Sequence, residues 1–373
     1  NNERILLGAA HQYNVFTNSC SACGLCETIC PNDFNMAEMC LEARRTMLKQ
    51  NFMPPSFHEF ALDDMAFSNG EPFSLCRHEA GTTESAWLYF PSCQLSGSAP
   101  GEVTASYNYL RDKLSGGVGI MLHCCGAPAF WAGRDDLFKE ALAEIRASWE
   151  KMGKPRIITA CPTCQNIFQE HMPEMEPVSL WNVMLESGIP ASVCSRGTTG
   201  GTVSIVDPCV TRHDQVGQKN IRRILKSLGM EVEELPLSGE TPECCGYGGL
   251  MYNADPTLAR DVVERRTTAS DNDYLAYCAM CRDNFAFAGK RVSHLIEHIF
   301  PAVEDGDPAS RGWISWSERR ANRVRVKEMI LRALGEKTVE HTEEYEKLKL
   351  TMSPDVRKRI DSRRILEEDI RKV

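Results

Sequence analysis

The sequence predicts an α/β protein built from a helical N-terminal domain, two duplicated α/β domains with mostly parallel sheets, and a helical C-terminal arm. Two observations support this prediction. One cysteine pattern occurs twice, and around each copy apolar runs typical of strands alternate with segments of helical periodicity. A chain of 373 residues is long enough for two or three cores. We expect domain boundaries at residues 1–85, 86–200, 201–305 and 306–373.

The duplicated pattern consists of a single cysteine, a vicinal pair and a CxxC motif. The spacing is C-x30-CC-x35-CxxC in the first copy and C-x34-CC-x32-CxxC in the second. Matching cysteines lie 116, 120 and 117 residues apart (93 to 209, 124 to 244, 161 to 278), a period far longer than a solenoid repeat. The pattern therefore indicates an internal duplication. The first set comprises Cys93, Cys124, Cys125, Cys161 and Cys164, and the second comprises Cys209, Cys244, Cys245, Cys278 and Cys281.

The N-terminal domain is expected to hold short helices around a third cysteine cluster. Residues 36–50 are rich in strong helix formers. Two prolines and an Asn-Gly pair predict a loop over residues 52–71.

The first repeat combines short apolar runs with amphipathic segments. Strands are expected over 87–90, 118–122 and 156–160, and helices over 103–114 and 137–152. Each cysteine group follows a strand or opens the next helix. Since ligands of parallel sheets collect beyond the carboxyl ends of the strands, the cysteines are expected to meet there.

The second repeat follows the same order. Strands are expected over 202–206 and 274–277, and helices over 217–228 and 258–268. Residues 306–373 are highly charged but keep apolar positions at helical spacing, with a solvated helix expected over 352–373. We expect this arm to pack on its own chain or on a partner subunit.

Composition excludes several classes of protein. The net charge of −9 argues against a nucleic-acid partner, whose binding needs a basic footprint. No run of about 18 apolar residues occurs, and the first residues show no export signal. We therefore expect a cytoplasmic chain, either free or held at the inner face of the membrane by a partner subunit.

Seventeen cysteines require an explanation. Disulfides fit poorly, because the count is odd, the chain is large and vicinal cysteines rarely reach disulfide geometry. Zinc is the second alternative, but it takes four ligands, whereas each set offers five thiols and no nearby histidine pair. Iron–sulfur clusters fit best.

The third cluster is the run Cys20-x2-Cys23-Gly-x-Cys26-x3-Cys30-Pro31, which bacterial ferredoxins use to hold a 4Fe–4S cluster. The N-terminal domain is thus expected to be ferredoxin-like, with one such cluster. Its fourth ligand is left open between Cys30, Cys40 and Cys76. Cys40 lies mid-helix, where a buried apolar role is more common, and Cys194 is expected to be structural.

Other residues near the cysteines are candidates for catalysis and cofactor binding. His123 could donate a proton to a thiolate or only pack, and Arg212 and His213 could bind a substrate carboxylate or only cap a helix. Gly126 and Gly246 follow the vicinal pairs and give the backbone room to fold around a cofactor.

The duplicated motifs, His-Cys124-Cys125-Gly126 and Glu-Cys244-Cys245-Gly246, resemble the CCG cysteine-rich domain of the heterodisulfide reductase family. The resemblance covers residues 86–300, and the N-terminal ferredoxin run matches the order of the family's membrane-linked fused subunit, although such relatives usually carry two ferredoxin runs. It implies a catalytic subunit of the B/D type, in which each five-cysteine set holds a noncubane 4Fe–4S cluster and a disulfide is cleaved between the two.

Two functions follow from this resemblance. The first is an oxidoreductase that takes electrons through the N-terminal cluster and reduces, or forms, an organic or protein disulfide. The second is an electron-relay subunit of a larger respiratory or flavin-linked complex. Both imply a hetero-oligomer with an electron-donor subunit, either a flavoprotein or a membrane cytochrome, in anaerobic metabolism, and the first adds a small thiol or disulfide as substrate.

Overall fold

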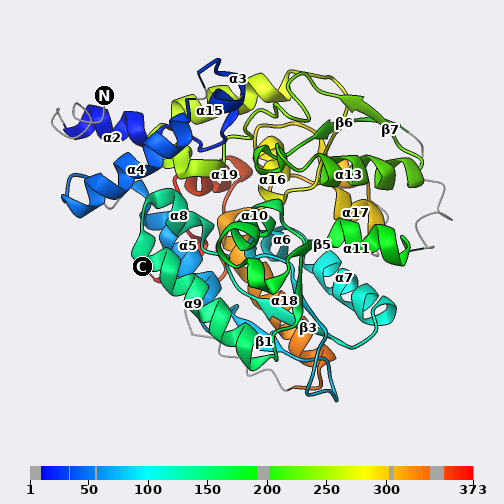
Figure 1. Ribbon diagram of the computed structural model, residues 1–373. Coiled ribbons are helices and arrows are strands. Elements are labelled where there is room, and N and C mark those ends of the chain that lie inside the picture. The colour runs from blue at the N-terminus through cyan, green and yellow to red at the C-terminus, as the bar shows by residue number, and fades with distance from the viewer. Residues whose placement is uncertain are drawn as a thin grey trace.

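The computed structural model describes residues 10–32, 34–54, 57–190, 201–301, 306–336 and 348–372. Cys194 lies outside these ranges. Two sheets surrounded by helices form the centre of the molecule (Figure 1). The predicted α/β class, with mostly parallel sheets and two repeats, is confirmed.

The first sheet has the strand order β1-β3-β2-β4-β5. All neighbours are parallel except β1, which pairs antiparallel with β3. Strand β3 is buried along its whole length, which explains why its sequence is a continuous apolar run. The bounds are β1 Leu75–Arg77, β2 Trp87–Phe90, β3 Val118–Leu122, β4 Arg156–Thr159 and β5 Val178–Ser179.

The second sheet has the order β7-β6-β8-β9 and is parallel throughout. When β1 is left aside, both sheets share one order, with the second strand of the repeat followed by the first, third and fourth. The duplication in the cysteine pattern is therefore also a duplication of topology. The bounds are β6 Thr202–Val206, β7 Glu231–Glu234, β8 Tyr274–Ala276 and β9 Val292–His294.

The helices of the repeats cover the sheets and follow the predicted periodicity. In α9 (Asp135–Lys151) the apolar residues expected to face the core, from Phe138 to Trp149, are buried. The side chain of Asp214 caps α13 (Gln215–Ser227) by accepting a hydrogen bond from the Gly217 amide. The others are α6 Cys93–Ser98, α7 Pro100–Lys113, α8 Ala127–Ala132, α10 Pro162–His171, α11 Leu180–Ser187, α14 Met251–Ala254, α15 Pro256–Thr267, α16 Ala279–Phe287 and α17 Leu295–Ile299.

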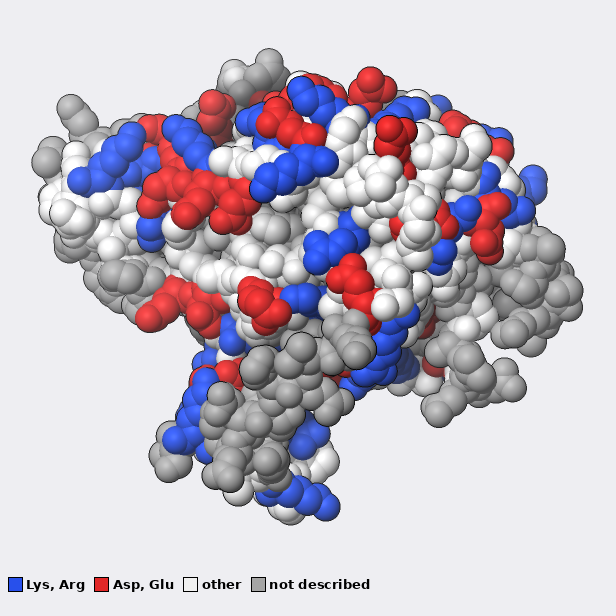
Figure 2. Space-filling model, turned by 90° about the horizontal axis from the view of Figure 1, so that it is seen from below, with Lys and Arg blue, Asp and Glu red and all other residues white. Residues whose placement is uncertain are grey.

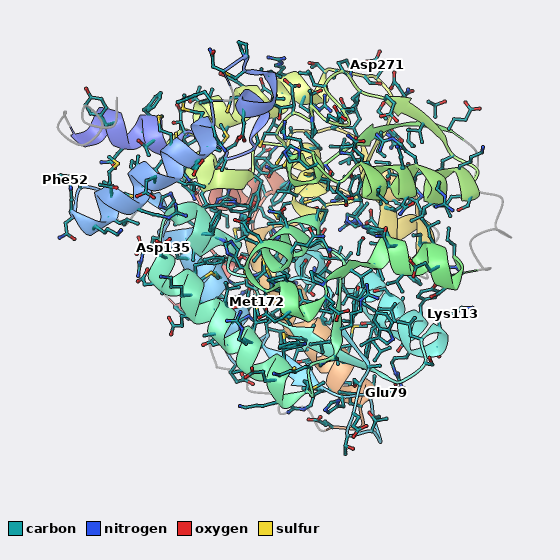
Figure 3. The ribbon with its side chains drawn as sticks, in the orientation of Figure 1. Phe52, Glu79, Lys113, Asp135, Met172 and Asp271 are labelled. Carbon is teal, nitrogen blue, oxygen red and sulfur yellow. The ribbon has the colours of Figure 1, made fainter. Side chains whose placement is uncertain are left out.

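The edges at which the parallel strands end face each other across the two sheets. Asp271 precedes β8, and Glu79 follows the antiparallel β1, so both residues mark the amino edges of their sheets. Figure 3 places them at opposite ends of the molecule. The carboxyl edges, where the cysteines lie, therefore meet in the middle.

The N-terminal helices lie on one side of the repeats (Figure 1). They are α2 Ala10–Asn18, α3 Leu25–Ile29, α4 Met36–Lys49 and α5 Glu59–Asn69. The prediction of a loop over residues 52–71 is wrong for most of that segment, which forms α5. The prolines stand before α5 and the Asn-Gly pair marks its end, so these signals bound a helix.

The C-terminal arm returns to the core. Helix α18 (Trp316–Ala333) packs against α6 and α7. The single helix expected over 352–373 is broken into α19 (Pro354–Ser362) and α20 (Glu367–Lys372) by Arg364, whose φ of 60° is left-handed. Among the described residues, no helix is both long enough and apolar enough to cross a membrane. Figure 2 shows acidic and basic side chains interspersed over one face.

A buried ion pair joins the C-terminal arm to α5. Arg323 of α18 holds the Asp64 carboxylate of α5 with two hydrogen bonds, of 2.7 and 3.0 Å, and donates a third to the Cys93 carbonyl. Burial alone would raise the pKa of Asp64, but the charge and hydrogen bonds of Arg323, together with the charges of Arg320 and Arg319, hold that pKa below its usual range. The pair therefore joins α18 and α5 to the first cysteine set.

Replacing Asp64 with alanine is expected to lower the free energy of unfolding by about 3–5 kcal/mol, because Arg323 is left buried and unpaired. Asp63→Ala is the matched control, since Asp63 is exposed and its pair with Arg320 is worth about 1 kcal/mol or less. Urea unfolding followed by circular dichroism measures both. Because the pKa of Asp64 is depressed, its contribution is present above about pH 4 and lost as the pH falls further. Equal losses in the two variants would contradict this account.

Candidate functional site

The strands deliver both cysteine sets to the centre of the molecule. In the first repeat, β2, β3 and β4 end shortly before Cys93, the vicinal pair and Cys161. In the second, β6 and β8 end shortly before Cys209 and Cys278, and the loop after β7 carries the second pair. One apolar cavity is lined by all five cysteines of the first set and by every cysteine of the second except Cys244.

In the first set the thiols form one chain of neighbours. Cys93 lies within hydrogen-bonding reach of Cys124, Cys125 contacts both Cys124 and Cys164, and Cys164 contacts Cys161. Hydrogen bonds from Cys124 and then Cys164 lower the pKa of Cys125 to about 6. Cys125 is thus stabilised as a thiolate, the form that binds metals.

The second set repeats this chain position by position. Cys209 contacts Cys244, Cys245 contacts Cys244 and Cys281, and Cys281 contacts Cys278. Hydrogen bonds from Cys244 and Cys281 hold the pKa of Cys245 well below its ordinary value. The second cysteine of each vicinal pair is therefore the central acceptor of its set.

The two sets meet at their CxxC motifs. Cys161 and Cys278 lie within hydrogen-bonding reach of each other across the cavity, and hydrogen bonds from Cys161 and then Cys281 hold the pKa of Cys278 well below its ordinary value. Cys161 is the N-cap of α10 and Cys278 the N-cap of α16. Two helix N-termini therefore direct their positive dipole ends at this point, which favours anionic sulfur.

The two glycines predicted to bind the cofactor occupy equivalent positions. Gly126 has φ 85° and Gly246 has φ 82°, a left-handed conformation that favours glycine. A Cβ atom at Gly126 would lie 2.9 Å from the ring of Phe138, and one at Gly246 would lie 2.7 Å from Val263. Both positions therefore require glycine to turn the chain after the vicinal pair.

The ferredoxin run is docked on the second set. Cys23 lies within hydrogen-bonding reach of Cys244, the one cysteine of that set that does not line the cavity. Cys20 contacts Cys40 of α4, and a hydrogen bond from Cys40 contributes most to lowering the pKa of Cys20 to about 7. Cys26 and Cys30 are half-buried on the same segment. The three cysteine clusters are therefore contiguous.

Arg44 of α4 clamps this segment in place. It is buried and donates five hydrogen bonds, two to the Thr17 carbonyl and one each to the carbonyls of Cys20, Trp131 and Gly249. These carbonyls belong to the N-terminal segment, the first repeat and the second repeat. No carboxylate of the described residues lies within ion-pair distance of Arg44, so its charge faces the thiols of Cys20 and Cys40.

The three predicted catalytic residues are not gathered at the cavity. Arg212 donates to the Cys23 carbonyl at 2.8 Å and to the Pro242 carbonyl at 3.2 Å, so it joins the ferredoxin run to the second repeat. His213 is exposed to solvent. His123 donates from Nδ1 to the Cys124 carbonyl and faces Glu144 through Nε2, and burial lowers its pKa.

Cys76 and Cys40 have opposite surroundings. Cys76 lies on β1 opposite Met121 of β3 and contacts no other described thiol, whereas Cys40 is buried against Cys20.

We expect Cys40→Ser to lose iron from the N-terminal site and Cys76→Ser to keep it, because of these two cysteines only Cys40 is in contact with the ferredoxin run. Iron and sulfide assays on the two variants measure this. Loss of iron from Cys76→Ser alone would contradict it.

The side chains fit an anionic, thiolate-bound group. Each repeated set places buried thiols around one cysteine whose pKa is lowered, two helix N-termini point at the junction of the sets, and Arg44 contributes a charge without a carboxylate partner among the described residues. Within the same ranges, no three His, Cys, Asp or Glu side chains are grouped to hold a single metal ion. Cys40 was one of the three candidates for the fourth ligand of the ferredoxin run, whereas the contacts of Arg44 were not predicted, because nothing in a helical pattern distinguishes a docking side chain from a core one.

Comparison with known proteins identifies the domains that carry the two cysteine sets. The family model of the cysteine-rich CCG domain matches residues 87–169 and 203–285. The chain is 25% identical over 332 residues to the D component of the dihydromethanophenazine:CoB–CoM heterodisulfide reductase of Methanosarcina mazei, covering 77% of each chain. It is 23% identical to the B component of the fumarate reductase (CoM/CoB) of Methanothermobacter marburgensis, over 66% of this chain and 51% of that one.

A shorter match, 27% identical over 157 residues, joins 40% of the chain to 22% of the EtfAB:quinone oxidoreductase of Syntrophomonas wolfei. The two matched cysteine-rich domains contain every thiol of the two five-membered sets, which implies iron–sulfur clusters in an oxidoreductase. The chain therefore contains two cysteine-rich CCG domains and is similar to the D component of heterodisulfide reductase.

Proposed function

We propose that the chain is the disulfide-active subunit of an iron–sulfur oxidoreductase complex. The observation that carries the proposal is the pair of five-thiol chains, equivalent contact by contact, that meet across one cavity at Cys161 and Cys278. A disulfide in this cavity would have one complete set on each side.

The ten cysteines of the repeats would hold two noncubane 4Fe–4S clusters, one for each set. Cys20, Cys23 and Cys26 would hold a ferredoxin-type cluster, with Cys40 as the proposed fourth ligand in place of Cys30 or Cys76. Bound there, clusters of this kind supply one-electron transfer, so that two of them can provide the two electrons of a disulfide cleavage.

The residues of the chain shape and isolate this site. Pro128, Trp131, Tyr247 and Met280 line the cavity together with the cysteines, and their apolar surface disfavours water there. Arg44 and Arg212 hold the ferredoxin run against Cys244, which gives electrons an entry at the second set. The reaction is RSSR′ + 2e⁻ + 2H⁺ → RSH + R′SH, with the electrons drawn from a partner subunit. The relatives are named as subunits, which supports a hetero-oligomeric complex with such a donor.

A relay subunit is the second candidate. It is favoured by the contiguity of the three cysteine clusters, which would serve electron transfer without any substrate, and by the similarity to a protein named as a quinone oxidoreductase. In this function the chain would pass electrons between a flavoprotein or cytochrome and another module.

Anaerobic oxidation of reduced benzyl viologen tests the proposal. We expect disulfides to stimulate the oxidation, with cystine, cystamine and the CoB–CoM heterodisulfide as probes, and Cys161→Ser to remove the stimulation. A purified chain with its iron intact that oxidises the dye at one rate with and without every disulfide would contradict the enzyme function and leave the relay.

A further inference from the structure

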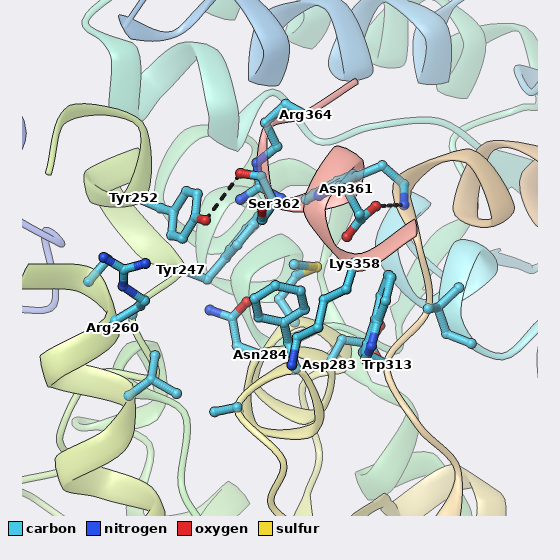
Figure 4. Close-up of a pocket in the computed structure, with 18 of the residues that line it drawn as sticks. Tyr247, Tyr252, Arg260, Asp283, Asn284, Trp313, Lys358, Asp361, Ser362 and Arg364 are labelled. Carbon is cyan, nitrogen blue, oxygen red and sulfur yellow. Dashed lines mark hydrogen bonds between the residues drawn. The ribbon is translucent and has the colours of Figure 1, made fainter. Parts of the chain in front are cut away.

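A second cavity lies between the second repeat and the C-terminal arm. It holds about 600 Å³, within the range typical of small-molecule sites. Its walls are α15, α16, the segment that leads into α18, and α19 of the C-terminal arm (Figure 4). Tyr247 and Met280 line both this cleft and the cysteine cavity, so the two are neighbours.

Aromatic side chains form much of the cleft. Phe287 of α16 and Trp313 pack edge to face with their ring centroids 5.5 Å apart. Tyr252 and Trp316 stand near Arg364, whose guanidinium lies 4.6 Å from each ring centroid. Aromatic walls of this kind suit a flat ring, because every planar π-system has a face that can stack.

The same cleft holds cations without acidic partners. Lys358 extends from α19 between Asn284 and Trp313 in Figure 4, and its ammonium lies 5.1 Å from the Phe287 ring. Within the described residues, neither Lys358 nor Arg364 has a carboxylate within 4 Å. Two of the carboxylates that line the cleft already have partners. Asp283 forms ion pairs with Arg282 and Arg319, and Asp361 accepts a hydrogen bond from the Trp316 amide.

The position of Arg364 is itself unusual. Its φ of 60° is left-handed, a conformation that costs a side-chain-bearing residue about 1 kcal/mol or more. The bend between α19 and α20 thus places a guanidinium, with no acidic partner in the described part of the chain, among aromatic rings. Attraction to the rings repays only part of its lost hydration. An anion bound in the cleft would give the Arg364 guanidinium a partner of opposite charge.

We propose that the cleft binds a planar aromatic ligand that carries a phosphate, sulfonate or carboxylate group. The ring would lie against Phe287 and Trp313, and the anionic group near Lys358 and Arg364. Gly246 follows Cys245 directly, and Met280 stands between Cys278 and Cys281, so the ring would sit beside the second cysteine set. Flavin and quinone compounds with an anionic group are therefore the class of ligand that fits.

Isothermal titration calorimetry under anaerobic conditions, with flavin mononucleotide and anthraquinone-2-sulfonate as probes, tests this site. We expect at least one probe to bind with one-to-one stoichiometry, and Lys358→Ala and Arg364→Ala to weaken it about tenfold each, the effect of losing one charge-assisted contact. Arg363→Ala is the matched control, because Arg363 is the exposed neighbour that does not line the cleft. Riboflavin, which has the same ring without phosphate, should bind at least tenfold more weakly than flavin mononucleotide if the latter binds.

Several results would overturn the proposal. They are no saturable binding of either probe, equal affinity of Lys358→Ala and the parent chain, or riboflavin binding as tightly as flavin mononucleotide. If Arg364→Ala undocks the arm, Lys358→Ala still decides the question, because the ammonium of Lys358 makes no hydrogen bond or ion pair with the described residues and lies only over the Phe287 ring. Binding is measured without any disulfide, so this proposal and the disulfide function fail independently.

Discussion

Cys245→Ser is expected to abolish disulfide-dependent dye oxidation, with a fall of at least about 100-fold, or roughly 2.7 kcal/mol in the activation barrier. Cys245 is the centre of the second set, where Cys244 and Cys281 both donate to its sulfur and hold its pKa well below the ordinary value. A serine hydroxyl stays protonated and is a harder donor, so it cannot replace a thiolate toward iron. Iron content and the rate with each disulfide are the two measurements.

Cys125→Ser, the equivalent change in the first set, should give the same loss. Cys76→Ser removes a half-buried thiol that touches neither set, and it should keep both iron and rate. A Cys245→Ser chain that retained full iron and rate would show that the second set is not a cluster site.

Gly249→Ala is expected to separate the ferredoxin run from the second repeat. Gly249 has φ 61°, and a Cβ atom there would lie 2.6 Å and 2.8 Å from the carbonyl carbon and Cα of Ser21. Because these atoms belong to backbone, the N-terminal segment must move, and the Arg44 bond to the Gly249 carbonyl is lost with it. We expect reduction of the repeats by the proposed donor subunit to fall at least about tenfold, because the proposed path of electrons crosses this contact.

Gly289→Ala is the control for Gly249→Ala. Gly289 has a left-handed φ of 89° but nothing within 4 Å of the added Cβ, so it carries the backbone strain without the collision. Rapid anaerobic mixing with the reduced donor compares the two variants, and far-ultraviolet circular dichroism confirms that both are folded. Equal rates in the two variants would show that docking at Gly249 does not govern electron entry.

The sequence supported prediction of the repeats better than of the contacts between them. Strands β2, β3, β4, β6 and β8 lie where apolar runs end in cysteine motifs, because a buried parallel strand leaves a strong local signal. The short strand β1 and helix α5 were missed, since three residues show no alternation and turn signals bound a helix as readily as a loop.

Contacts between modules leave no local signal. The approach of Cys23 to Cys244 and of Cys161 to Cys278 depends on how the repeats and the N-terminal domain pack, which no spacing along the chain records. Arg212 followed a cysteine and suggested a substrate group, yet its guanidinium is occupied by backbone carbonyls.

The C-terminal arm shows the same limit. The segment 352–373 was expected to be solvated, but Asp361 and Leu366 are buried, and α19 forms one wall of the aromatic cleft. Its charged sequence predicts a helix, but the surface on which that helix packs is set by residues elsewhere in the chain.

The most direct test of the account is low-temperature EPR of the anaerobically purified chain, with iron and sulfide counted, before and after thiols are added under mild oxidation. Three clusters with a disulfide-active site predict about twelve irons per chain and a new paramagnetic signal that a specific thiol induces. About four to eight irons, with no thiol-dependent signal, would contradict the proposed disulfide chemistry.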